Sequence, residues 1–196
     1  MASKVTIANA ALHQIGATQI TAFTEDSKPA RIINDRYDVV RDSVFRAHPW
    51  NCLTVRVKIS ADVATPAFGY AKQFTLPTDP FCLRVIALSN PNIVYQIEGR
   101  KLLSDEDEIE LKYIGRITDV STYDTLLSET ISAALAHDIA YPLVGSTTLS
   151  TVLYEKYLQK LSEARFIDAT EDNLINVNSI SESHILEANT FISSRF

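Results

Sequence analysis

The sequence is poor in the residues that mark specialised protein classes. Only five glycines and seven prolines occur among its 196 residues, which excludes collagen-like and low-complexity chains. Its apolar stretches are interrupted well before the roughly 18 residues that span a bilayer, and the N-terminal residues lack the uninterrupted apolar core of a signal peptide. We therefore expect a cytosolic globular protein without a membrane span, large enough to bury a core without a disulfide or metal.

Cysteines and metal-ligand motifs are equally scarce. The two cysteines, Cys52 and Cys82, fall in strand-like runs and are expected to be buried apolar side chains rather than a disulfide. The four histidines form no His-x-x-x-His pair, and the densest acidic group, residues 105–110, lacks the spacing of an EF-hand loop. We predict a solvated hairpin tip at this acidic group, with unspecific Ca²⁺ binding as the open alternative, and no bound cofactor.

Motifs that carry catalysis are missing as well. The chain has no Gly-x-Ser-x-Gly elbow, no Walker loop and no Gly-x-Gly-x-x-Gly turn. His137 stands beside Asp138, which could tune a general base, but on an Ala-rich helix such a histidine is more often packed or hydrogen-bonded. Nothing in the sequence resembles an active site, so we predict that the protein is not an enzyme.

Negative charge is concentrated in one part of the chain. The formal net charge is -6, from 18 basic and 24 acidic side chains, which disfavours a general nucleic-acid binder because phosphates attract clustered Lys and Arg. Residues 1–50 carry six basic and five acidic side chains, residues 51–120 eight and nine, and residues 121–196 four and ten. The basic residues of the middle part are interleaved with acids, a pattern that favours a charge-matched protein contact over a DNA track.

The first fifty residues show helical periodicity. Apolar residues spaced by three and four predict a short helix over residues 4–15 and a longer one from about Pro29 to about His48. The second helix also pairs opposite charges on its other face, a face that we expect to be solvated or to lie at a subunit boundary. These pairs are Asp38 with Arg41 and Asp42 with Arg46.

Helical periodicity returns in the last third of the chain. A long Ala-rich helix is predicted from Tyr123, and Pro142 and Gly145 should bend or end it. Ser146 or Thr147 can cap the helix that follows. The apolar residues of that last helix step by four and three, and they are Leu149, Leu153, Tyr157, Leu161 and Ala164.

Between the helical parts, from Trp50 to about Arg116, the apolar period changes to two, which is typical of strands. Two connections are short enough for hairpins, at Glu98-Gly99 and at 104–107. We expect a small antiparallel sheet or barrel rather than a βαβ layer. The candidate strands are CLTVRVKIS, AKQFTLP, LRVIALS, NIVYQIE, RKLLS and EIELKYIG.

The last residues, 173–196, contain four Asn and five Ser, yet they keep many apolar side chains. A merely solvated tail would not hold so many, so this segment is predicted to be an arm that docks on another surface. The alternative is a last helix that packs on its own domain. The candidate contact residues of the arm are Ile180, Ile185, Leu186, Phe191 and Ile192.

Four features follow one another in a characteristic order: the HPWN end of the second helix, the YAKQFTLPTD turn, the IEGRKLLS hairpin and the AYPLVGS break. In this order the chain resembles the tail tubular protein A family, the adaptors between portal and nozzle in short-tailed bacteriophages. The likeness covers nearly the whole chain, to about Asp172.

The resemblance implies a structural virion protein of the phage tail, assembled in the host cytoplasm. In that family twelve copies form a ring between the portal protein and the tail nozzle, tail tubular protein B, and genomic DNA passes through the channel without specific binding. The charged face of the second helix would then meet the neighbouring subunit. An acidic channel wall would let DNA slide, because like charges limit binding.

The resemblance, together with the periodicities, leads us to expect an α+β fold in three parts. Residues 1–49 and 117–172 form a helical bundle, and residues 50–116 form an inserted antiparallel β domain. Residues 173–196 form an extended or helical C-terminal docking arm.

Two other hypotheses stay open. The chain could be a glycan hydrolase or glycan-binding tail component that acts on the host surface, or a cellular domain of unrelated role. An enzyme requires a cleft with converging carboxylates and perturbed pKa values. An adaptor requires large apolar or charge-matched surfaces instead.

Overall fold

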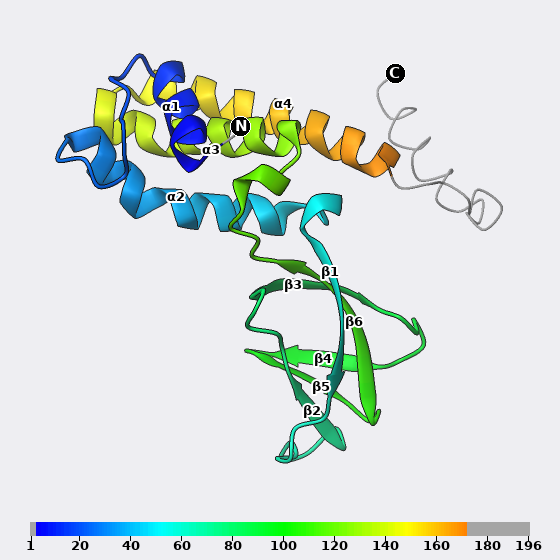
Figure 1. The fold of residues 1–196 in the computed structure, drawn as a ribbon. Helices are drawn as coiled ribbons and strands as arrows, with labels where there is room; N and C mark the ends of the chain where they lie inside the picture. Colours follow the sequence, from blue (N-terminus) through cyan, green and yellow to red (C-terminus); the bar gives the residue numbers. More distant parts are fainter. Residues whose placement is uncertain (1–2, 172–196) are drawn as a thin grey trace.

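The computed structural model describes residues 3–171, and the predicted C-terminal arm lies outside them. Over these residues the fold is α+β, as expected, with four α-helices and two small antiparallel sheets. The helices form one layer, and the strands project from it as a β segment (Figure 1). The elements are α1 (Lys4–Gln14), α2 (Lys28–Ala47), β1 (Thr54–Ser60), β2 (Lys72–Thr75), β3 (Cys82–Leu88), β4 (Tyr95–Glu98), β5 (Lys101–Ser104), β6 (Glu108–Gly115), α3 (Thr125–Val144) and α4 (Thr147–Glu171).

Each helix starts where a short polar side chain can accept a backbone N–H bond. These bonds satisfy donors that have no partner inside the helix. Gly145, at φ 74°, ends α3 in the left-handed conformation, whereas Pro142 lies inside the helix. The caps are Ser3 for α1, Ser27 for α2, Asp124 for α3 and Ser146 for α4.

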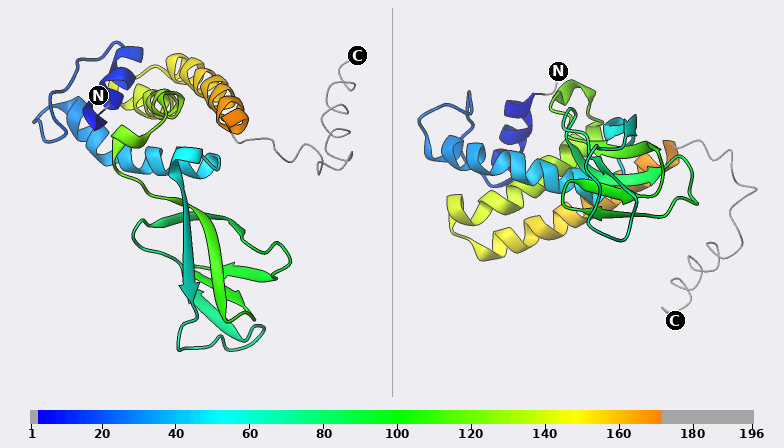
Figure 2. Two further views of the ribbon diagram at one scale, coloured as in Figure 1. Left: turned by 45° about the vertical axis from the view of Figure 1, so that its right-hand side comes forward. Right: turned by 90° about the horizontal axis from the view of Figure 1, so that it is seen from below.

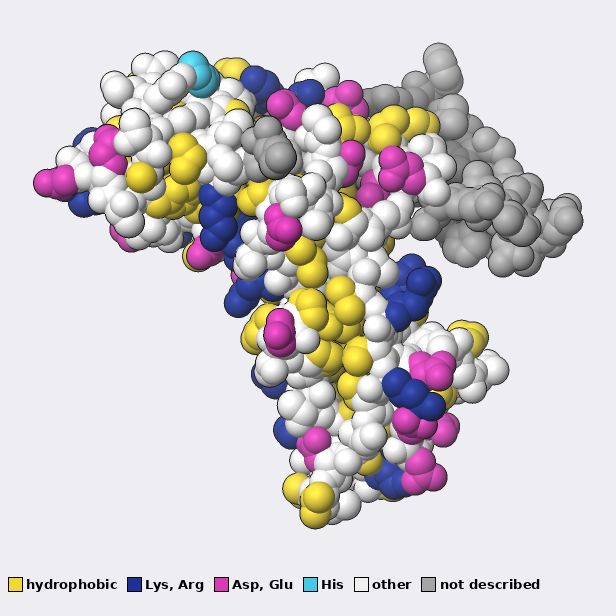
Figure 3. Space-filling view, viewed as in Figure 1, with side chains coloured by type: hydrophobic (Ala, Val, Ile, Leu, Met, Phe, Trp, Pro, Cys, Tyr) yellow, Lys and Arg dark blue, Asp and Glu magenta, His cyan; other side chains and the backbone are white. Residues whose placement is uncertain are grey.

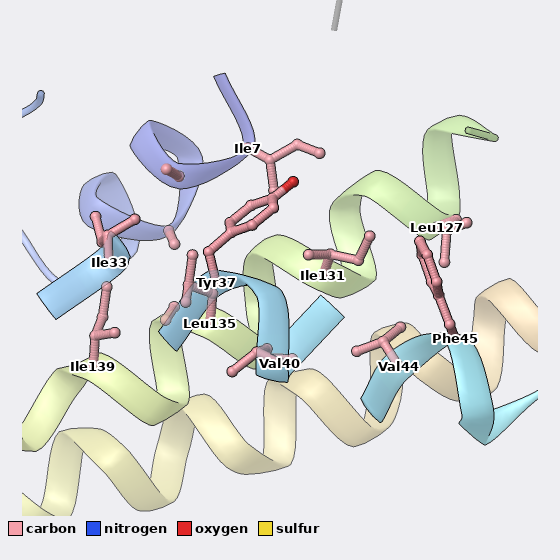
Figure 4. Close-up of a cluster of buried hydrophobic side chains, with 14 of the residues drawn as sticks. Ile7, Ile33, Tyr37, Val40, Val44, Phe45, Leu127, Ile131, Leu135 and Ile139 are labelled. Carbon is pink, nitrogen blue, oxygen red and sulfur yellow. The ribbon is translucent and has the colours of Figure 1, made fainter. Parts of the chain in front are cut away.

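The centre of the helical layer is α3, which packs against α1, α2 and α4. Ten of its residues are buried, and a helix that is apolar on most sides is typical of such a central position. Figure 4 shows side chains of α2 and α3 pointing toward one another across this core, among them Tyr37, Val44, Ile131 and Leu135. Burying each large apolar side chain stabilises the fold by about 1.5–3 kcal/mol.

The β segment has a smaller core of its own. One sheet has the strand order β1-β6-β3 and the other has the order β2-β5-β4, and all pairs are antiparallel. The alternating inward residues of both sheets meet in a separate cluster. Its buried members are Phe74, Leu76, Cys82, Leu88, Leu102, Ile109, Leu111 and Tyr113.

One predicted hairpin is confirmed and the other is wrong. Strands β4 and β5 pair through the turn at Glu98-Gly99, where Gly99 has φ 56°. Strands β5 and β6 do not pair, because β5 lies between β2 and β4 whereas β6 lies between β1 and β3. The chain at 104–107 therefore crosses from one sheet to the other, which lets the apolar faces of both sheets pack together. Alternation within each strand fits either arrangement, so the period could not reveal the crossover.

The β segment leaves the helical layer beneath one end of α2, as two views agree (Figures 1 and 2). At this junction Trp50 is buried, and its indole N–H donates to the carbonyl of Val44 at 3.0 Å. Asp168 of α4 accepts the backbone N–H of Asn51 at 3.1 Å and lies 3.0 Å from Nε2 of His48. The last helix thus holds the turn from which the β segment begins.

We predict that Leu161→Ala lowers the free energy of unfolding by about 2–5 kcal/mol, because its buried side chain fills the contact between α4 and α3. The matched control is Leu158→Ala on the same helix, where the side chain is 45% exposed. That variant should change stability by less than about 0.5 kcal/mol. Urea unfolding followed by circular dichroism measures both, and equal losses would contradict this packing.

Candidate functional site

The charged face of α2 is largely engaged inside the chain. The side chain of Arg41 is 3% exposed, and its Nη1 and Nη2 donate to Asp38 at 2.6 Å and to Asp42 at 2.7 Å. The predicted pair of Asp38 and Arg41 is therefore present. Because a buried guanidinium needs a nearby carboxylate, these two acids first of all neutralise Arg41.

The predicted pair of Asp42 and Arg46 is wrong. Asp42 instead binds Arg116, which follows β6, at 2.6 Å, and Arg46 donates to the carbonyl of Leu83 in β3. Sequence spacing on one helix cannot anticipate that partners from the β segment outcompete a neighbour four residues away. The side chain of Asp38 is 66% exposed and so stays open to a partner.

The apolar candidates of the predicted arm are not placed by the structure. Ile180, Ile185, Leu186, Phe191 and Ile192 lie outside the described residues. Their role in docking stays a prediction.

Most lysines of the β segment pair with acids of the same segment. Lys58 lies 2.7 Å from Glu108, Lys101 lies 2.5 Å from Asp62, and Lys72 pairs with Asp107. Within the acidic group at residues 105–110, Asp107 and Glu108 are thus paired with lysines. Within residues 3–171 there is no group of three or more His, Cys, Asp or Glu side chains that could hold a metal ion.

The carboxyl groups with a clear pKa shift are shifted downward. Each accepts hydrogen bonds that favour its charged form. A general acid of a glycan hydrolase needs the opposite, a raised pKa. The groups, each with its principal donor, are Glu25 with Thr21, Asp62 with Lys101 and Asp119 with Ser121.

The candidate thiols and the candidate base are packed into the fold. Both cysteines are free, and burial raises the pKa of the Cys52 and Cys82 thiols, which keeps them protonated. His137 Nδ1 lies 3.0 Å from the carbonyl of Ser150, whereas Asp138 binds Arg36 through two bonds of 2.7 and 2.8 Å. His137 and Asp138 therefore take part in different helix contacts. This agrees with the expectation that His137 is a packed or hydrogen-bonded residue.

The outward side of α4 is the largest unexpected feature. Tyr154, Leu158 and Phe166 are 45%, 45% and 68% exposed. They are separated by four and eight residues, which places them on one side of the helix. Val152 and Ile167 add exposed apolar surface beside this stripe. Single exposed apolar residues are ordinary, but several along one helix mark a contact surface. We call these five residues the α4 face.

The sequence carried a signal for the α4 face that the inward stripe of the same helix concealed. Tyr154, Leu158 and Phe166 are separated by four and eight residues, whereas the inward residues Leu149, Leu153, Tyr157 and Leu161 step by four without a gap. Two apolar stripes on one helix are typical of a helix with two packing partners. In the described structure α3 packs on α4. Hydrophobic side chains also reach the surface of the β segment (Figure 3), with Val63 and Phe68 almost fully exposed.

Comparison with known proteins gives no family. No protein-family model matches the chain, and a search of curated proteins found no significant match. The likeness to tail tubular protein A thus depends on the order of segments in the sequence. None of the described helices is long and apolar enough to cross a membrane.

We predict that Arg41→Ala lowers the free energy of unfolding by about 1.5–3 kcal/mol, because Asp42, whose side chain is 18% exposed, loses the charge-assisted hydrogen bonds of the buried guanidinium. Arg56→Ala, at an exposed position of β1, is the control and should stay within about 0.5 kcal/mol of wild type. Chemical denaturation of both variants at neutral pH provides the test. A loss no larger than that of the control would show that the network does not support the fold.

A second prediction concerns Asp62, whose pKa is lowered by its bond from Lys101. A lowered pKa contributes stability above the unfolded value, near pH 4, and this contribution is lost as pH falls through the folded value. The stability difference between wild type and Asp62→Asn should therefore shrink on acidification. In a Lys101→Met background this pH dependence should be much weaker. Thermal melts between pH 2 and pH 7 measure it, and an equal pH dependence in both backgrounds would contradict the role of Lys101.

Proposed function

We propose that the chain is a non-enzymatic structural adaptor, a ring component that joins the portal of a short-tailed phage to the tail nozzle. The observation that carries the proposal is the α4 face, a helix surface with five exposed large apolar side chains in a protein of net charge -6. Such a surface favours stable contact with another protein. The order of sequence segments that resembles tail tubular protein A supports the same function.

The two-part architecture suits a protein that contacts different partners. The helical layer and the projecting β segment each have a buried core and each expose apolar side chains. In the proposed ring one part meets the portal, the other meets the nozzle, and repeated head-to-tail contacts between copies close the circle. Twelve copies are proposed by analogy with the family. The site of action is the virion, after assembly in the host cytoplasm.

The charge distribution supports a channel through which DNA passes. Residues 121–171 carry seven acidic and three basic side chains, a net charge of -4. Acidic walls repel phosphates, so a genome slides past them without being held. A hydrolytic role draws less support, because the carboxyl groups of the described chain with a clear pKa shift have lowered pKa values, whereas a general acid needs a raised one.

The test is co-sedimentation of the purified protein with the portal protein of the same phage. We predict a complex that sediments faster than either component, and that Leu158→Glu combined with Phe166→Glu weakens it at least tenfold, since both charges would be buried in an apolar contact. Gln159→Glu, an exposed position between them, is the matched control and should bind as wild type does. A wild-type chain that stays monomeric and never binds portal would overturn the proposal.

A further inference from the structure

A groove lies between the two sheets of the β segment, next to the end of α2. Its volume is about 380 Å³, and it is lined by the first half of β3 on one side and by the β4–β5 hairpin on the other. Both β3 and β4 are edge strands of their sheets. We call this feature the β3–β4 groove. Its lining residues are Arg46, Leu76, Phe81, Cys82, Leu83, Arg84, Val85, Ile97, Gly99 and Arg100.

Three arginines line the groove, and their guanidinium groups donate to backbone carbonyls. Arg46 donates to Leu83, and Arg84 donates to the carbonyl of Arg46 at 3.0 Å. Arg100 donates to three carbonyls, including that of Cys82 at 2.6 Å, and stacks on the Phe81 ring at 3.9 Å.

Within the described chain no carboxylate lies within 4.0 Å of the charged nitrogens of these three arginines, unlike the paired lysines nearby. Arg46 and Arg84 are exposed, and each uses one of its five N–H donors on a carbonyl. Three positive charges thus converge on a groove in an acidic protein. This arrangement suits a ligand with carboxylates.

The rim of the groove offers backbone and apolar contacts. Every residue of β4 is exposed, and in the described structure β4 pairs only with β5. Val94, Tyr95 and Ile97 are 73%, 36% and 43% exposed along this edge. An exposed strand edge with apolar side chains is a ready template for an added extended segment. The groove therefore fits a peptide that is both acidic and apolar.

We propose that the β3–β4 groove docks the C-terminal segment, residues 173–196, of a second copy of this chain. The segment combines Glu182 and Glu187 with apolar residues such as Ile180, Ile185 and Leu186, and its one basic residue is Arg195. Its chemistry is thus complementary to the groove in charge and in hydrophobicity.

The position of this segment in the chain also fits a contact between copies. It follows α4 directly, and 24 residues span at most roughly 80 Å, far enough to reach a neighbour. A groove and its complementary segment on the same chain generate a head-to-tail contact, which closes into a ring when the rotation allows. The inference rests on the self-association that the proposed function requires.

The test is photo-crosslinking of the full-length protein with benzoylphenylalanine in place of Ile97, at the exposed rim of the groove. Mixed ¹⁴N and ¹⁵N preparations distinguish links within one chain from links between copies. We expect mixed-isotope crosslinks to residues 173–196. Three results would overturn the assignment of this segment. They are crosslinks within one chain, crosslinks to described residues of another copy, and no crosslinks in a sample that sediments as an oligomer.

A charge exchange tests the same contact without a crosslinker. Arg84→Glu should weaken self-association about tenfold, as should Glu182→Arg combined with Glu187→Arg, because each change sets like charges against each other. Combining the changes in one protein should restore most of the lost self-association. Arg56→Glu, an exposed arginine on β1 away from the groove, is the control and should associate as wild type does.

The outcomes separate this inference from the proposed function. A protein that forms an oligomer and binds portal, but ignores the charge exchange, would refute the groove contact and leave the adaptor role standing. Crosslinks to residues 173–196 in a protein that never binds portal would support the groove contact and refute the adaptor role. A chain that stays monomeric at all concentrations and never binds portal would overturn both.

Discussion

The relative placement of the two parts of this protein depends on Asp168, a buried carboxylate near the end of α4. It accepts the backbone N–H of Asn51 and contacts His48, so the last helix fixes the turn between α2 and β1. At the second connection, which leads from β6 back into the helices, Arg116 binds Asp42 of α2. Both connections between helical layer and β segment are therefore held by charged groups with bonded partners, which makes the arrangement specific as well as stable.

The helices and most strands could be predicted because their signals are local. Apolar periods mark all four helices, serine or aspartate side chains cap their starts, and Gly145 in the left-handed conformation ends α3. The crossover between β5 and β6 could not be predicted, since register between sheets depends on packing that alternation alone does not encode. The contact of Asp168 in α4 with the α2–β1 turn could not be predicted either, because it joins residues that are 117 positions apart in the sequence.

The candidate site shows a similar division. The pair of Asp38 and Arg41 follows from helix spacing, whereas the partner of Asp42 comes from the end of β6. The α4 face was present in the sequence as a second stripe of residues separated by four and eight positions, but the inward stripe of the same helix accounted for the helix without it. The groove arginines are distant in sequence, and only the fold brings them together.

We propose that other protein molecules cover the exposed apolar and basic surfaces of this two-part chain. Native mass spectrometry of the purified full-length chain tests this most directly. The account predicts closed multiples of the 21.8 kDa chain, with twelve copies as the proposed ring. A single species at the mass of one chain, unchanged with concentration and with added portal protein, would contradict it.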